Sequence, residues 1–290
     1  MPNKIFLIFK LMRLQSPTGY LLVFFPACFG LGLTNISIYE YNFIKLLLLL
    51  FIGSVITRSA GCVINDIFDK NFDKSVLRTK NRPLANGSLT VAEALILLLI
   101  LSISSLTILL CLNKITIYLG FLSAIMIGLY PLMKRITNLP QIFLGFTFNF
   151  GVLIASSAVL DRVSIESVAM YIACCFWTIG YDIIYGFMDL KDDKKINIKS
   201  MALFLESKNY KLHLYIYYTL FIILFIFANV MVSSHFLNYI AILLAYIMLL
   251  WQVVTLNIAD PQNCLIRFKN NNYVGIVLIL SLLNNFAIIP

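Results

Sequence analysis

Long runs of hydrophobic residues alternate with polar connections along the whole chain. A helix needs about 20 apolar residues to cross the hydrocarbon core of a bilayer. The runs are continuous rather than alternating between apolar and polar positions, so they predict helices and not the strands of a membrane barrel. Nine predicted spans cover residues 18–38, 44–63, 91–112, 114–133, 139–160, 166–186, 212–233, 236–256 and 273–289.

The composition agrees with a membrane protein rather than a soluble one. Of the 290 residues, 61% are hydrophobic and only 12% are charged, and the mean hydropathy is +0.92. A typical soluble domain has about 25% charged residues, which cover its surface. We therefore expect an all-α integral membrane bundle of about nine transmembrane helices around a central cavity, in a single domain of residues 1–290.

The positive charges gather on one side of this predicted bundle. Three of the 22 Lys and Arg residues fall near the short, odd-numbered connections: Lys45, Lys114 and Arg162. Arg58 lies inside the second span, and the other 18 lie in the N-terminal segment or the even-numbered connections. The positive-inside rule places those segments, including 64–90 and 187–211, in the cytoplasm. Topology thus explains the net charge of +9, and we expect no nucleic-acid partner.

Local features refine this outline. The six cysteines include no Cys-x-x-Cys pair, and most lie in or beside apolar runs, so we expect no disulfide and no zinc or iron–sulfur site. The basic and then apolar N-terminus predicts a short interfacial helix before the first span rather than a signal peptide. Thr90 and Glu93 form a capping box that marks the start of the third span.

Two clusters of aspartates stand out, each at the end of an even-numbered span. In the first, Asp66, Asp69 and Asp73 have the spacing i, i+3, i+7, which places three carboxylates on one helical face. The second cluster repeats this facial spacing with Asp182, Tyr185, Asp189 and Asp193. Under the predicted topology, both clusters lie on the cytoplasmic face of the membrane.

Ionised carboxylates at the end of a membrane helix repel one another and are costly near lipid. Hard oxygen ligands of this kind suit Mg²⁺, which binds through one or two carboxylates together with substrate phosphates. Either cluster alone could be solvated loop aspartates. The matched pair on one membrane face favours a site for a metal-bridged diphosphate.

Several cations could neutralise phosphate oxygens beside these clusters. Arg78 and Arg82 follow the first cluster, and Lys134 and Arg135 end the fourth span. The alternative interpretation is that they only mark topology. Arg58, about two turns before the first cluster, is a candidate for function because intramembrane arginines are rare, although a structural ion pair to an aspartate would also explain it.

These residues resemble the signatures of a known family. The stretch Arg58–Asp73, continued by Arg78–Leu84, resembles the first signature of the UbiA prenyltransferase superfamily, and Tyr181–Asp193 resembles the second. Tyr130–Gly145 and Lys199–Ala202 resemble its 4-hydroxybenzoate branch in particular. The resemblance covers nearly the whole chain.

The resemblance implies a Mg²⁺-dependent enzyme of the bacterial inner membrane. It would transfer a polyprenyl group from polyprenyl diphosphate to the ring carbon ortho to the hydroxyl of 4-hydroxybenzoate, a step of ubiquinone synthesis. Membrane lipid would surround the hydrocarbon tail. The expected metal ligands are Asn65, Asp69, Asp73, Asp189 and Asp193, with Asp73 acting directly, through water or by orienting the others.

Further roles complete this expectation. Asp66 would act through water or orient the metal ligands, Tyr185 would face the allylic cation, and Asp182 would bind the phenol or accept the ring proton. Arg58 or Arg135 would bind the benzoate carboxylate, while Arg78, Arg82 and Lys134 would bind substrate phosphates.

The sequence leaves two alternative functions open. The nearest is another branch of the same superfamily, with haem or a naphthoate as the acceptor. A membrane transporter is the alternative from a different class, and it predicts charges near the bilayer midplane and broken helices.

Overall fold

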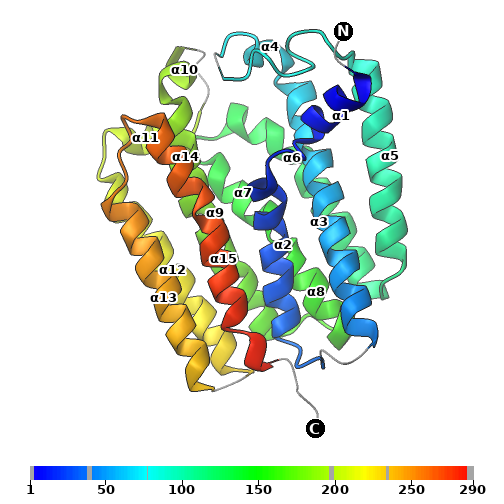
Figure 1. Ribbon diagram of the computed structural model, residues 1–290, viewed down its shortest axis with the longest axis vertical. Helices are drawn as coiled ribbons and strands as arrows, with labels where there is room; N and C mark the ends of the chain where they lie inside the picture. The colour runs from blue at the N-terminus through cyan, green and yellow to red at the C-terminus, as the bar shows by residue number, and fades with distance from the viewer. Residues whose placement is uncertain (1–2, 38–40, 77, 196–198, 233–234, 286–290) are drawn as a thin grey trace.

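The apolar runs form helices throughout the part of the chain that the structure describes. The computed structural model describes residues 3–37, 41–76, 78–195, 199–232 and 235–285, apart from the side chains of Tyr41, Lys134, Lys191, Asp192 and Asn284. Every regular element in these ranges is helical (Figure 1). The elements are α1 (Lys4–Met12), α2 (Pro17–Gly32), α3 (Tyr41–Phe68), α4 (Lys70–Asp73), α5 (Val91–Leu110), α6 (Lys114–Ile136), α7 (Pro140–Phe148), α8 (Phe150–Leu160), α9 (Ile165–Gly186), η1 (Phe187–Asp189), α10 (Leu190–Lys195), α11 (Met201–Glu206), α12 (Tyr210–Val230), α13 (Phe236–Val254), α14 (Pro261–Lys269), α15 (Asn271–Leu280) and η2 (Leu283–Asn285).

The all-helical membrane fold is confirmed, but the count of nine spans is not. Within the described residues, seven helical segments are long and apolar enough to cross a membrane, and α1 with α2 makes an eighth if this bent pair is one span. The predicted last span, 273–289, begins in α15, which has 10 residues, and its end lies outside the described residues.

Two local predictions of helix boundaries are confirmed, whereas the interfacial position of the N-terminal helix stays a prediction. α1 is a separate short helix, bent by 47° from α2. The capping box also forms as predicted, because the Thr90 hydroxyl accepts from the Glu93 N–H while the Glu93 carboxylate accepts from the Thr90 N–H. α5 therefore begins at Val91, where the sequence placed it.

The most buried of the seven candidate spans contains α9, which packs against α12, α7 and α14. Its Trp177 stacks on Phe221 of α12, with ring centroids 5.4 Å apart. α2 packs closely on α8, because a Cβ at Gly30 would lie 2.1 Å from the Val152 carbonyl oxygen. Small residues of this kind let membrane helices approach each other.

One predicted span is broken in its middle. Residues 139–160 form α7 and α8, which separate at Asn149. The buried Asn149 side chain donates to the Gly145 carbonyl at 2.6 Å and to Thr178 Oγ1 at 2.9 Å. A side-chain amide can thus bind a backbone carbonyl freed by a break in the helix, as a membrane interior requires.

The outer helices expose apolar side chains to their surroundings. On α5, Ile96 and Leu99 are 61% and 59% exposed, and α6 and α13 present similar faces. Apolar faces of this size indicate contact with lipid. α1, α4 and α10 all lie at one end of the bundle, and this is the end that carries both aspartate clusters (Figure 1).

Candidate active site

The first aspartate cluster lies where α3 ends and α4 begins. α3 continues to Phe68, beyond the predicted end at residue 63, so it carries Asn65 and Asp66. The Asp69 N–H donates to the Asn65 carbonyl and the Asp73 N–H donates to the Asp69 carbonyl, both at 2.8 Å, so the chain keeps its helical direction through the turn. All three carboxylates are buried.

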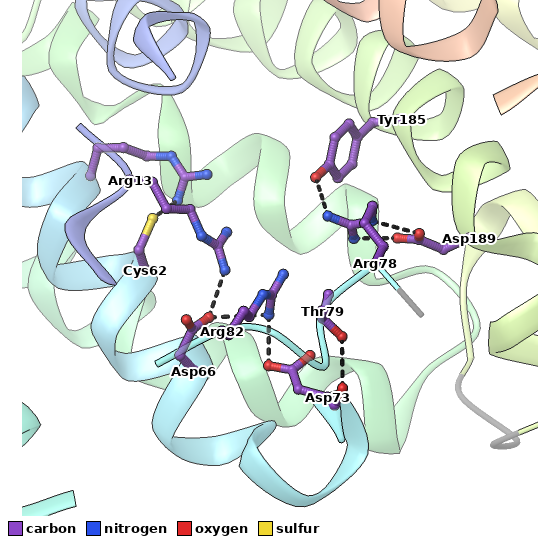
Figure 2. A network of polar contacts seen from close by, with 10 residues as sticks. Arg13, Cys62, Asp66, Asp73, Arg78, Thr79, Arg82, Tyr185 and Asp189 are labelled. Carbon is purple, nitrogen blue, oxygen red and sulfur yellow. Dashed lines mark hydrogen bonds and ion pairs between the residues drawn. The ribbon is translucent and has the colours of Figure 1, made fainter. Parts of the chain in front are cut away.

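Two of these carboxylates are held by arginines from elsewhere in the chain (Figure 2). Asp66 Oδ1 accepts from Arg13 Nη2 at 2.6 Å and from Arg82 Nη1 at 3.1 Å. The same Arg82 nitrogen donates to Asp73 Oδ2 at 2.7 Å. Charges so well buried need such partners. Asp66 and Asp73 therefore hold Arg82 in place.

The second cluster begins in α9 and continues through η1 into α10. Arg78, which follows the first cluster, forms a bidentate ion pair with Asp189. Its Nε donates to Asp189 Oδ1 at 2.8 Å, and its Nη2 donates to Asp189 Oδ2. Arg78 Nη1 also donates to the Tyr185 hydroxyl at 3.0 Å. These contacts join the connection that follows the first cluster to the second cluster (Figure 2).

Arg78 remains a cation in this position. Burial lowers the pKa of its guanidinium, but Tyr185 and Asp189 raise that pKa by more, so it stays above its ordinary value. The Tyr185 ring is covered by Arg78, whose guanidinium carbon lies 5.4 Å from the ring centroid, and by Phe268, whose ring centroid lies 4.7 Å away.

Both clusters open into one cavity of about 750 Å³ at this end of the bundle. Nine of the predicted site residues line it: Arg58, Asn65, Asp69, Arg78, Arg82, Asp182, Tyr185, Asp189 and Asp193. Asp66 and Asp73 do not line this cavity but contact Arg82, which does. Residues of both clusters thus share one cavity.

The structure describes only one of the two cationic side chains that end α6. The Arg135 guanidinium donates to the Phe68 carbonyl at 3.0 Å, lies over the Phe72 ring, and does not line the cavity. The side chain of Lys134 lies outside the described residues. The prediction that Lys134 binds phosphate therefore stays a prediction.

Arg58 differs from the other arginines of the cavity. Its Nη1 donates to the thiol of Cys62 at 2.8 Å, and its guanidinium carbon lies 5.5 Å from the Phe148 ring centroid. Its Nε is buried without a hydrogen-bond partner. Among the residues that the structure describes, Arg58 contacts no carboxylate, whereas Arg13, Arg78 and Arg82 each do.

The residues around the cavity fit a hard divalent cation. Asn65 Oδ1 is buried without a partner, and such an orphaned acceptor is costly unless a donor or a cation reaches it. Within the described part of the chain, no three His, Cys, Asp or Glu residues lie close enough to hold a metal by themselves. Mg²⁺ does not need such a cage, because it commonly combines one or two carboxylates with waters and substrate phosphates.

A second, apolar chamber of about 420 Å³ continues from the charged cavity into the bundle. It lies among α2, α3, α5, α6, α7 and α8, and reaches Leu112 beyond the end of α5. Four residues line both spaces: Arg58, Asn65, Tyr130 and Phe148. We call these four residues the neck.

Several residues of the cavity were not singled out from the sequence. Arg13 and Lys269 are far from both clusters in the sequence, so no spacing connects them with the site. Gln141 and Lys199 lie in stretches that carry the family resemblance, and that was the available signal. Gln141 Oε1 accepts from the Met201 N–H at 3.0 Å, which ties α7 to the start of α11.

Fold and site together define a multi-pass helical membrane protein with a charged cavity that opens onto an apolar chamber. The chain belongs to the UbiA prenyltransferase family, whose family model matches residues 23–277. This confirms the resemblance seen in the two aspartate signatures.

Individual comparisons agree with this assignment. A 4-hydroxybenzoate octaprenyltransferase of Coxiella burnetii (strain CbuK_Q154) is 31% identical over 274 residues, which cover 94% of each chain. The apo structure of a UbiA homolog from Aeropyrum pernix K1 has a TM-score of 0.75 at 23% identity, covering 90% of this chain and 96% of that one. The structure of a UbiA homolog from Archaeoglobus fulgidus bound to GPP and Mg²⁺ has a TM-score of 0.70 at 18% identity. The match covers 97% of this chain and 99% of that one.

Proposed function

We propose that this chain transfers a polyprenyl group from polyprenyl diphosphate to the ring carbon ortho to the hydroxyl of 4-hydroxybenzoate, in ubiquinone synthesis. The observation that carries the proposal is the meeting of both aspartate clusters on one cavity that continues into an apolar chamber. The full-length similarity to a 4-hydroxybenzoate octaprenyltransferase supports the choice of acceptor.

The charged cavity would hold the diphosphate. Asn65 and Asp69 on one side, with Asp189 and Asp193 on the other, would bind Mg²⁺, which stabilises the charge that develops on the leaving diphosphate. Asp189 holds Arg78 beside these ligands. Asp66 and Asp73 together hold Arg82 there. Lys134 would add a further cation.

The apolar chamber would hold the prenyl tail and exclude water from the allylic cation. A tail in the chamber and a diphosphate in the cavity place the reacting carbon at the neck. Tyr130 and Phe148 supply aromatic faces there, and such faces stabilise cations. Tyr185, the aromatic nominated from the sequence, would act mainly by holding Arg78.

The acceptor would approach the same carbon. Of the two arginines considered for its carboxylate, Arg58 fits better, because it lines the neck and has no carboxylate partner among the described residues. An unneutralised cation within a membrane span is costly, and an anionic substrate offsets that cost. Asp182 lines the cavity and would bind the phenol or take up the ring proton.

The transporter alternative has less support. One span is broken, at Asn149, but the aspartate clusters lie at one end of the bundle rather than midway along it. A transporter also has no need for an apolar chamber of this kind beside its charged residues.

An acceptor assay tests the proposed function. Membranes that contain the protein, supplied with Mg²⁺ and a polyprenyl diphosphate, should prenylate 4-hydroxybenzoate. Membranes with an Asp69→Ala, Asp189→Ala double variant serve as the control and should not. Transfer to a naphthoate or to haem in place of 4-hydroxybenzoate would contradict the proposed acceptor.

We also propose that the charged end faces the cytoplasm of the bacterial inner membrane. The excess of Lys and Arg in the segments at that end supports this orientation. A reporter that is active only in the cytoplasm should work when it is fused to the N-terminus. Activity of a periplasm-specific reporter at that position would overturn the orientation.

A further inference from the structure

The neck brings a fixed positive charge close to the place where a second positive charge must form. Heterolysis of the C1–O bond of polyprenyl diphosphate sends the electron pair to the diphosphate and leaves an allylic cation at C1. With the tail in the chamber and the diphosphate in the cavity, C1 lies at the neck. Arg58 lines that neck and faces both spaces.

The position of Arg58 along α3 decides which charge it affects more. Arg58 precedes Asn65 by seven residues, so it lies about 10 Å deeper along the helix than this proposed metal ligand. It is therefore on the tail side of the diphosphate. Its repulsion of the allylic cation should outweigh its attraction for the more distant leaving group, whose charge is already offset by Arg78, Arg82 and the metal.

Within the described residues, no carboxylate forms an ion pair with Arg58. Its polar partner is Cys62 Sγ, and its ring partner is Phe148. Its Nε is buried and lacks a hydrogen-bond partner. The other three arginines of the cavity, Arg13, Arg78 and Arg82, are each paired with an aspartate.

We propose that Arg58 couples ionisation of the prenyl diphosphate to the presence of the acceptor. Without an acceptor, the guanidinium opposes formation of the allylic cation at the neck. When the acceptor carboxylate binds Arg58, the charge is cancelled and the C1–O bond can break. The ring carbon then attacks C1, and its proton leaves to a base. This inference rests on the proposed function, because it takes a carboxylate-bearing acceptor and a prenyl diphosphate as substrates.

Such coupling would protect the donor from water. If the cation formed with no acceptor present, water would attack C1 and give polyprenol, diphosphate and a proton. Two unit charges about 6 Å apart, at an effective dielectric constant near 20, change an ionisation rate by about 100-fold. A neutral residue at position 58 should therefore raise acceptor-free hydrolysis by at least about tenfold.

The test measures diphosphate release from polyprenyl diphosphate with Mg²⁺ and no acceptor, in purified protein. Arg58→Met should release diphosphate faster than the wild type, and Arg58→Lys, which keeps the charge, should stay close to the wild type. Arg267→Met is the matched control, because that arginine lies over Trp251, outside both the cavity and the chamber, and this change should have no effect.

A second arm uses the wild-type protein, so it does not depend on how a variant folds. Benzoate carries the carboxylate but lacks the hydroxyl that activates the ring, and it should raise diphosphate release. Phenol carries the hydroxyl but no carboxylate, and it should not. In Arg58→Met, benzoate should have no effect.

Two results would overturn the inference: release by Arg58→Met no faster than by the wild type, or phenol as effective as benzoate. Transfer to 4-hydroxybenzoate is measured in the same preparations. Absence of transfer in the wild type would contradict the proposed function itself. Normal transfer in the wild type, together with acceptor-free hydrolysis by Arg58→Met at the wild-type rate, would contradict only the coupling.

Discussion

The two aspartate clusters have the same facial spacing in the sequence, yet their surroundings differ. In the first cluster, Asp66 and Asp73 are buried and bind Arg82, and Asp66 also binds Arg13. In the second, Asp182, Asp189 and Asp193 all line the cavity and are partly exposed. Asp189 pairs with Arg78, whose side chain is 36% exposed.

This difference shows that equal spacing does not mean equal roles. The first cluster combines two ligand candidates that face the cavity, Asn65 and Asp69, with two carboxylates that hold an arginine. The second cluster presents its carboxylates to the cavity and pairs with Arg78, which lies in the connection that follows the first cluster. Experiments on paired positions can separate these roles.

Removal of the metal should have the largest effect, because both clusters are proposed to act through it. EDTA should reduce prenyl transfer to background, and Mg²⁺ should restore it, because the arginines of the cavity would not by themselves offset the charge on the leaving diphosphate. Transfer to 4-hydroxybenzoate in washed membranes is the measurement. Full activity in the chelator would contradict the metal assignment for both clusters.

Loss of one proposed ligand from either cluster should be nearly as severe. Asp69→Ala and Asp189→Ala should each lower the rate of transfer by at least about 1000-fold, because the leaving group loses electrostatic stabilisation. Both proteins should still accumulate in the membrane, which is checked by their yield and by thermal unfolding in detergent. Near-normal turnover in one variant would show that its cluster does not bind the metal.

The supporting arginines should differ in their effect on stability. Arg82→Ala removes the cation that two buried carboxylates share, and it should lower the free energy of unfolding by about 3 kcal/mol. Arg78→Ala breaks a more exposed pair, so it should lower that free energy by less than about 1 kcal/mol while it weakens binding of the donor. Denaturant or thermal unfolding of both proteins measures the contrast, and equal losses would refute it.

The smallest effect should follow Arg135→Met. Arg135 lies over Phe72 and outside the cavity, so the KM for 4-hydroxybenzoate should change by less than about threefold, within the range of a lost surface contact. Steady-state kinetics with varied acceptor gives the value. A large rise in this KM would mean that Arg135, rather than Arg58, binds the carboxylate.

Much of this fold could be predicted from the sequence because lipid imposes a simple rule on it. Apolar runs of spanning length must become helices, and the polar residues that interrupt them mark the ends. The break at Asn149 was hidden because a single polar residue in an apolar run rarely ends a helix. The end of α3 was misplaced because hydropathy falls at Asn65 while the backbone hydrogen bonds continue.

The site was predicted in part for the same reason. Helical spacing located the two clusters, but it could not show that Asp66 faces Arg13 and Arg82 rather than the cavity. That arrangement depends on α1 bending back toward the end of α3, which no local pattern records. The absence of a carboxylate beside Arg58, among the described residues, likewise became visible only in three dimensions.

Metal binding in paired variants tests the central claim most directly. Mn²⁺ binding, followed by electron paramagnetic resonance with an unreactive analogue of the prenyl diphosphate, should be weakened at least about tenfold by Asp69→Asn and equally by Asp189→Asn. That result would place both clusters on one metal-bound diphosphate. Unchanged Mn²⁺ affinity in either variant would contradict a shared site.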